Sequence, residues 1–169
     1  MSSEIEPMID RLLETIHATG YSIVTSQDGS WCLYNLGGEI KIYLRQVDDL
    51  YVLSTTERAR DEHILFTSPQ LVDIELALLY RFTNLFRRRE RRPFLMPTSV
   101  PVTASKAAPG YTVSKDFNGT WLLQSPDGPR RTGRQITLIE FSHYADMSPY
   151  ELWTSMNHAE NSIFRPLSH

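Results

Sequence analysis

Apolar side chains recur every three or four positions near the start of the chain, and Gly20 ends the series. This spacing predicts an amphipathic helix over about residues 4–18. Ser3 and Glu6 have the spacing of a capping box, which would begin this helix. The apolar positions concerned are Ile5, Met8, Ile9, Leu12, Leu13 and Ile16.

From Tyr21 onward the apolar positions alternate with polar ones, which is typical of strands with one buried face. Asp28-Gly29, Gly37-Gly38 and Asp48-Asp49 are turn sequences that divide this stretch. The pattern predicts a four-stranded antiparallel meander, with a weaker fifth strand near residues 64–66. The four predicted strands lie within 21–24, 31–34, 40–44 and 50–54.

Helical spacing returns after Ser68-Pro69, which suit the start of a helix. We predict the longest helix over about residues 69–90, with its apolar face on the sheet. Four prolines in residues 93–109 then favour an extended connection. The apolar face of the helix consists of Leu71, Ile74, Leu78, Phe82 and Leu85.

The last third of the chain repeats part of the first. A second hairpin is predicted after Gly110. A short helix follows over residues 135–144, with Ile136, Ile139 and Tyr144 spaced for burial. A last helix begins at the capping box of Ser148 and Glu151. Both hairpins have the order Gly-Tyr, turn glycine, Trp-x-Leu and closing glycine, at a constant offset of 90 residues. The matched pairs are Gly20 and Gly110, Tyr21 and Tyr111, Gly29 and Gly119, Trp31 and Trp121, Leu33 and Leu123, and Gly38 and Gly128.

These elements predict an α+β fold. An antiparallel sheet, built from the meander and the second hairpin, packs against the long helix and is flanked by N-terminal and C-terminal helices. The length of 169 residues suits one domain. Its parts are 1–92 with the helix, meander and long helix, 93–109 as the proline-rich connection, and 110–169 with the second hairpin and two helices.

Composition places the chain among ordinary soluble globular proteins, at 41% hydrophobic and 22% charged residues. The sequence shows neither an export signal nor an apolar run of roughly 20 residues, so we expect a cytoplasmic protein without a membrane span. Cys32 is the single cysteine, as expected in a reducing compartment. The net charge of -3 gives no reason to expect nucleic acid.

Motifs that usually carry catalysis are missing from the sequence. Glycine-rich phosphate loops and the serine-hydrolase elbow are absent, and the five histidines never have the spacing of paired metal ligands. We therefore expect no enzyme activity, no cofactor and no metal. A thiol enzyme using Cys32 is the remaining catalytic alternative, but its position within a predicted strand favours a buried structural residue. His143 is expected to pack or to cap a helix.

Two charged segments are candidates for binding. The arginine-rich run Arg87–Arg92 suits the end of a helix, and a nucleic-acid site is the alternative interpretation. The polar segment 54–62 is expected at one end of the sheet, beside the Asp48-Asp49 turn, where it would offer a charged edge to a protein partner. A solvated loop without a binding role is the alternative interpretation. The residues expected in that interface are Asp48, Asp49, Glu57, Arg58, Arg60, Asp61 and Glu62.

The order and spacing of several short motifs, over roughly residues 10–158, resemble the actinobacterial immunity-protein family that contains the antitoxin of the tuberculosis necrotizing toxin. The C-terminal end departs from the family pattern, in which the chain finishes in a short tail of Asp, Gly or Arg followed by Pro-Leu. Here residues 157–162 precede Arg165-Pro166-Leu167. The motifs that carry the resemblance are Gly20-Tyr21, Gly37-Gly38-Glu39, Thr55-Thr56-Glu57-Arg58, the stretch from Pro93 to Pro97, Pro109-Gly110-Tyr111-Thr112 and the segment from Ile139 to Tyr144.

The resemblance implies a cytosolic antitoxin that binds an NAD-degrading toxin domain and blocks its substrate site. The chain would be a monomer, or form a 1:1 heterodimer with the toxin. A secretion chaperone that holds an effector before export is the alternative within the class of binding proteins.

Overall fold

The computed structural model describes residues 4–58, 60–158 and 162–167. Helix α1 spans Ile5–Ala18 and buries one apolar face, as predicted. Ser3 of the predicted capping box lies outside the described residues, and the side chain of Glu4 at the N-cap makes no capping hydrogen bond to the helix backbone. Helix α1 is therefore stabilised by its buried stripe, which consists of Ile5, Met8, Ile9, Leu12 and Ile16.

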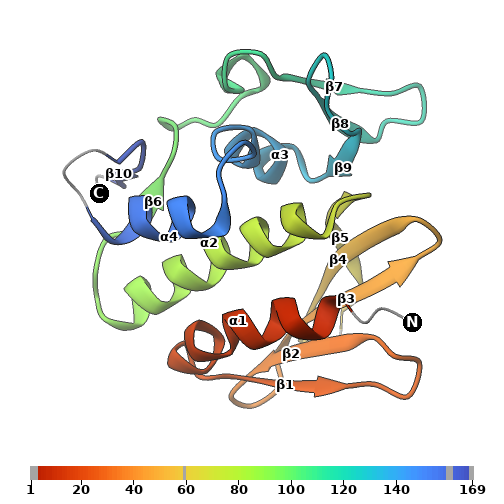
Figure 1. Ribbon diagram of the computed structural model, residues 1–169, viewed down its shortest axis with the longest axis vertical. Coiled ribbons are helices and arrows are strands. Elements are labelled where there is room, and N and C mark those ends of the chain that lie inside the picture. Colours follow the sequence, from red (N-terminus) through yellow and green to blue (C-terminus); the bar gives the residue numbers. More distant parts are fainter. Residues whose placement is uncertain (1–3, 59, 159–161, 168–169) are drawn as a thin grey trace.

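One antiparallel sheet contains strands from both halves of the chain (Figure 1). The predicted meander is confirmed and includes the fifth strand, so that β1 to β5 follow in order. A second meander, β7 to β9, continues the sheet because β9 pairs with β5. The strands are β1 Tyr21–Thr25, β2 Trp31–Asn35, β3 Ile40–Val47, β4 Leu50–Glu57, β5 His63–Ser68, β7 Thr112–Lys115, β8 Trp121–Gln124 and β9 Arg131–Gly133.

The junction between the two meanders depends on Gly133. A Cβ atom at this position would lie 2.4 Å from the Leu65 carbonyl oxygen and 3.1 Å from Phe66 Cα. Beside it, the hydroxyl groups of Thr67 and Thr132 share a hydrogen bond of 2.6 Å across the strands. Only a residue without a side chain allows β9 to approach β5 this closely.

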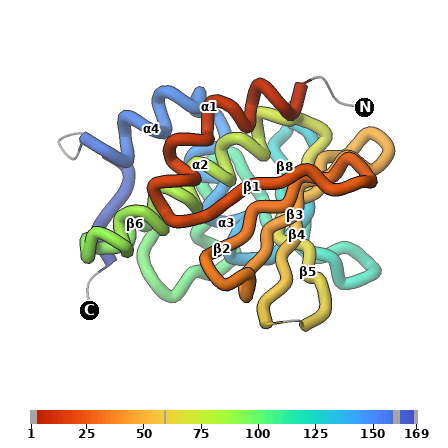
Figure 2. Tube along the Cα trace, turned by 90° about the horizontal axis from the view of Figure 1, so that it is seen from below, coloured from red at the N-terminus to blue at the C-terminus, as the bar shows by residue number. Residues whose placement is uncertain are grey.

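The helices gather on one face of the sheet (Figures 1 and 2). Helix α2, Leu71–Arg89, is nearly as long as predicted, and α3 spans Gln135–Ser142. Ile139 is buried as expected, whereas Ile136 is exposed, so its predicted burial is wrong. Helix α4, Pro149–Asn157, begins with the predicted capping box. No helix in the described ranges is both long and apolar enough to cross a bilayer.

Helix α2 is buried on more than its apolar face, because the sheet, α1 and α4 all pack on it. Two of its carboxylates are consequently buried and paired with arginines. Arg131 Nε lies 2.6 Å from Asp73 Oδ2, and its Nη2 lies 3.1 Å from Asp73 Oδ1. Arg11 binds Glu75 in the same two-pronged way, at 2.8 and 2.7 Å. The pattern of apolar residues gave no indication of these pairs.

The proline-rich connection is mostly irregular, as predicted, but it contains two short elements. Strand β6, Leu95–Met96, pairs with β10, Arg165–Pro166, and Ala104–Lys106 forms a single 3₁₀ turn. Asn84 of α2 fastens the connection, because its side chain accepts from the Leu95 N–H at 2.8 Å and donates to the Leu95 carbonyl at 3.1 Å.

The repeated hairpins have matching backbone geometry. In the β1–β2 turn, the Ser26 N–H donates to the Ser30 carbonyl at 2.8 Å. In the β7–β8 turn, the equivalent Asp116 N–H donates to the Thr120 carbonyl at 2.9 Å. The glycine four residues into each hairpin turn has a positive φ of about 81–82°. The offset of 90 residues therefore marks a structural repeat, placed at the two opposite edges of the sheet.

Candidate binding surface

Three hairpin turns lie on the same side of the molecule, on the right in Figure 1. They are the β1–β2 turn (residues 26–30), the β3–β4 turn (48–49) and the β7–β8 turn (116–120), and we call this surface the hairpin-tip side. In the pairing register the first and third turns lie at opposite strand ends. Adjacent strands rotate by about 20–25°, so eight strands accumulate enough twist to bring both turns to one side.

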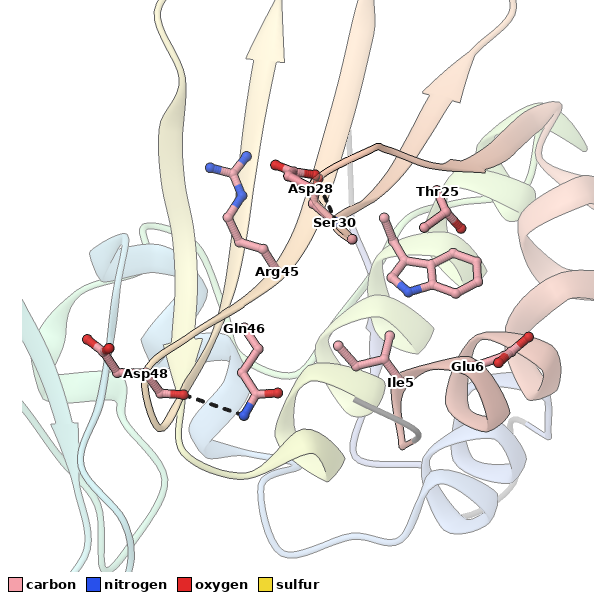
Figure 3. A pocket seen from close by; sticks show the side chains of 10 residues that line it. Ile5, Glu6, Thr25, Asp28, Ser30, Arg45, Gln46 and Asp48 are labelled. Atoms are coloured by element: carbon pink, nitrogen blue, oxygen red, sulfur yellow. Dashed lines mark hydrogen bonds between the residues drawn. The ribbon is translucent and has the colours of Figure 1, made fainter. Parts of the chain in front are cut away.

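A depression of about 670 Å³ lies on this side, between the β1–β2 turn, the β3–β4 turn and the first turn of α1 (Figure 3). Ile5 of α1 and Trp31 of β2 supply apolar surface, and most of the remaining lining is polar. The polar side chains that line the depression are Glu6, Thr25, Asp28, Ser30, Arg45, Gln46 and Asp48.

Local hydrogen bonds fix the two turns that carry Asp28 and Asp48 at the rim. Asp28 accepts from the Ser30 hydroxyl at 2.6 Å and from the Ser30 N–H at 3.0 Å, and these bonds hold the pKa of the Asp28 carboxyl below its usual value. Asp48 has a left-handed φ of 52°, and its carbonyl accepts from Gln46 Nε2 at 3.4 Å. Both acidic side chains therefore stand on ordered turns.

Arg45 is the one cation in the lining, and it already has a partner. Its Nη2 lies 2.9 Å from Glu62 Oε1, which also accepts from the Ser54 hydroxyl at 2.5 Å. The Arg45 guanidinium lies 5.3 Å from the centre of the Tyr43 ring. Since Glu62 offsets this charge, the three lining carboxylates leave the depression acidic, which suits a cationic group of a partner.

The structure separates the residues that the sequence placed in one charged edge. Asp48 and Asp49 lie at one end of β4, whereas Glu57 and Arg58 lie at its other end. Eight residues of extended strand separate the two groups, or about 26 Å. The expected adjacency is therefore wrong, because a hairpin turn and the loop after its return strand lie at opposite ends. Arg60 and Asp61 belong to the distant loop, and Glu62 reaches back to Arg45.

The arginine-rich run ends a helix, as the simpler interpretation predicted. Arg87 Nε donates to the Pro93 carbonyl at 2.9 Å, and Arg89 Nη1 donates to the Ala18 carbonyl at the end of α1 at 3.1 Å. These two side chains satisfy carbonyl groups at the end of α1 and just beyond the end of α2. Arg88, Arg91 and Arg92 line a separate depression of about 620 Å³ with Pro93, Phe94 and Leu167.

Neither Cys32 nor His143 has the surroundings of a catalytic group. Cys32 is 7% exposed, and burial raises the pKa of its thiol, which disfavours the reactive thiolate. His143 caps the end of α3, with Nε2 2.8 Å from the Lys106 carbonyl oxygen. Among residues 4–58, 60–158 and 162–167, no three His, Cys, Asp or Glu side chains are close enough to hold a metal ion; His169 lies outside these ranges.

A cavity of about 240 Å³ lies between α2 and α3, partly open to solvent, and its lining includes ionisable groups that the sequence pattern did not indicate. Burial raises the pKa of the Glu140 carboxyl to about 7. Arg81 also lines the cavity, and its Nε is buried without a hydrogen-bond partner among the described residues. Arg81 and Glu140 lie at helical spacing from apolar residues. The periodicity of the sequence therefore gave no sign that these two ionisable side chains line a cavity.

Comparison with known proteins gives a consistent set of relatives. A family model described as Immunity protein 61 matches residues 15–162. The immunity factor for TNT of Mycobacterium tuberculosis and its Mycobacterium bovis homolog are each 24% identical over 144 residues, covering 81% of this chain and 80% of the relative. The solved structure of Rv3902c from M. tuberculosis superposes with a TM-score of 0.78 at 22% identity, covering 98% of this chain and 94% of that one.

Proposed function

Because this chain belongs to the immunity protein 61 family, we propose that it is an antitoxin that binds the folded domain of a toxin and inhibits it sterically. The match over residues 15–162 carries this proposal, since it includes the eight-stranded sheet, helices α2 to α4 and the last turn of α1. Inhibition would need no catalysis by the antitoxin. The raised pKa of the Cys32 thiol supports a binding role over a thiol enzyme.

In this proposal the partner is a toxin domain related to TNT, and the toxin is a glycohydrolase that degrades NAD. Two relatives are named as immunity factors for TNT or its homolog, and both align over four fifths of this chain. We propose that the antitoxin acts in the cytoplasm, as a monomer alone and as a 1:1 heterodimer with the toxin.

Co-expression tests this function directly. The toxin domain whose gene lies beside that of this chain is induced in a host cell with and without the antitoxin, and cellular NAD is measured. We expect loss of NAD and of viability without the antitoxin, and preservation of both with it. A host that dies equally fast in both cultures contradicts the proposal.

A secretion chaperone is the second candidate of the binding class. Light scattering after mixing with the purified, folded toxin domain separates the two functions, because an antitoxin must form a 1:1 complex with the folded domain. A chaperone would instead bind the unfolded segment alone. A catalytically inactive toxin variant serves as the matched ligand, since steric inhibition does not require turnover.

The proposed working surface is the hairpin-tip side, with Asp48 and Asp49 among its residues. The acidic depression next to them supports this choice. The loop that carries Glu57, Arg58, Arg60 and Asp61 is the alternative surface, and Glu62 lies between the two. A nucleic-acid site at Arg88, Arg91 and Arg92 would require binding that weakens steeply with salt.

A further inference from the structure

The β7–β8 turn displays a phenylalanine that the fold does not use. The side chain of Phe117 is 96% exposed. The turn beneath it is held by Asp116, whose carboxylate accepts from the Asn118 and Thr120 N–H groups, both at 2.9 Å. Arg130 lies 3.4 Å from the same carboxylate. An ordered turn thus presents an aromatic ring to solvent.

The repeated hairpin provides an internal comparison. Gln27 occupies the position equivalent to Phe117, in a turn closed by the same backbone hydrogen bonds. Gln27 is exposed as well, so a polar residue satisfies this turn geometry. Neither the turn nor the core therefore requires an aromatic residue at position 117.

Phe117 is not an isolated apolar residue on this side of the molecule. Val24 precedes the β1–β2 turn, and Val47 and Leu50 flank the β3–β4 turn; all three are exposed. These turns and the β7–β8 turn form the hairpin-tip side (Figure 1). Single exposed apolar residues are common on protein surfaces, but exposed apolar residues at three neighbouring turns offer apolar contacts to a partner that covers this side.

Carboxylates accompany these apolar groups. Asp28, Asp48 and Asp49 are exposed on the same side. Of the cations near these turns, Arg45 and Arg130 are paired with Glu62 and Asp116, and Lys115 lies over the Trp121 ring at 5.0 Å. A complementary partner presents an apolar pocket bordered by lysine or arginine side chains. Buried aromatic anchors of this kind carry a large share of binding energy in protein interfaces.

We propose that Phe117 is the apolar anchor of this antitoxin and that the toxin domain covers the hairpin-tip side. This inference rests on the proposed function. The occupant is a folded protein domain in which the Phe117 ring enters an apolar pocket with a basic rim. The rigid turn lowers the entropy that is lost when the ring is buried.

The test compares two exposed apolar residues that lie on different sides. Phe117→Gln copies the repeated hairpin, and Leu36→Gln is the matched control, because Leu36 is 93% exposed in the β2–β3 turn at the other end of β2. With the folded toxin domain as ligand, we expect Phe117→Gln to raise Kd about 30-fold or more, mainly through faster dissociation. Leu36→Gln should change Kd by less than about threefold.

A charge reversal identifies which end of the sheet is covered. Asp48→Lys with Asp49→Lys should slow association at low salt, whereas Asp61→Lys, in the distant loop, should leave the rate unchanged. The opposite pattern would place the toxin on the loop end and overturn the proposal.

Amide hydrogen exchange on the unmodified antitoxin gives an independent result that needs no variant. Complex formation should protect residues 115–121 and 47–50 from exchange. A tight complex with unchanged exchange there, or unchanged Kd for a folded Phe117→Gln variant, refutes the anchor but leaves the antitoxin function intact. If the unmodified chain forms no complex at all, the proposed function itself fails.

Discussion

Replacing Asp73 tests the physical account of how the two halves of the chain are held together. Asp73 of α2 and Arg131 of β9 form a two-pronged ion pair with side chains that are 1% and 4% exposed, and the Ser68 hydroxyl donates to the same carboxylate. Asp73→Asn keeps the shape of the side chain but leaves the buried Arg131 charge without its counterion.

The expected loss follows from that burial. Breaking a buried pair by removing one partner costs about 3–5 kcal/mol, because the remaining charge stays desolvated. For a chain of this size the midpoint of thermal unfolding should fall by about 6–20 °C. Arg131 also lies over the Phe141 ring at 5.3 Å, which offsets only part of the lost interaction.

The adjacent ion pair is the matched control. Arg130 and Asp116 are 3.4 Å apart and the Arg130 side chain is 57% exposed, so Arg130→Ala should cost only about 0.2–1 kcal/mol. Urea unfolding followed by circular dichroism measures both variants. The double variant Asp73→Leu with Arg131→Met should be more stable than Asp73→Asn, because no charge remains buried. A loss below about 1 kcal/mol for Asp73→Asn would refute this reasoning.

Three further results are expected. Burial raises the pKa of Glu140 from 4.5 to about 7, so the folded chain retains a proton that the unfolded chain releases. Stability is therefore lost as pH rises through that window. Glu140→Gln should match the parent near pH 4 and exceed it at pH 8 by up to about 3 kcal/mol in thermal melts. Gly133→Ala places a Cβ 2.4 Å from the Leu65 carbonyl oxygen and should lower the melting temperature sharply or prevent folding, whereas the neighbouring Thr132→Ser, which keeps the hydroxyl, should have a small effect. If residues 1–169 form one domain, far-ultraviolet dichroism and tryptophan fluorescence should report a single coincident unfolding transition; two separated transitions would contradict the single-domain prediction.

The spacing of apolar residues in the sequence was enough to predict most of the helices and strands. The helical spacing before Gly20, the alternation after Tyr21 and the capping box at Ser148 each act over a few residues, so they are visible without any tertiary information. The offset of 90 residues correctly identified two equivalent hairpins, since the turn glycines and the Trp-x-Leu strands have local conformational causes. Ile136 shows the limit of such spacing, because its exposure depends on which elements actually cover α3.

The candidate surface was harder to predict, since its residues come together only through pairing and twist. The charged edge failed as a single surface because the β3–β4 turn and the β4–β5 loop lie at opposite ends of β4. Arg45 and Glu62 were separated by an entire hairpin in the sequence but form an ion pair across the sheet.

The sequence by itself determined the local elements, the repeat and the absence of familiar catalytic motifs, because these depend on neighbouring residues. Only the tertiary structure decided that β9 joins β5 through Gly133, that Asp73 and Arg131 form a buried pair, and that the β7–β8 turn lies on the same side as the β3–β4 turn. These features arise from contacts between distant segments and from twist accumulated over eight strands, which no local pattern encodes.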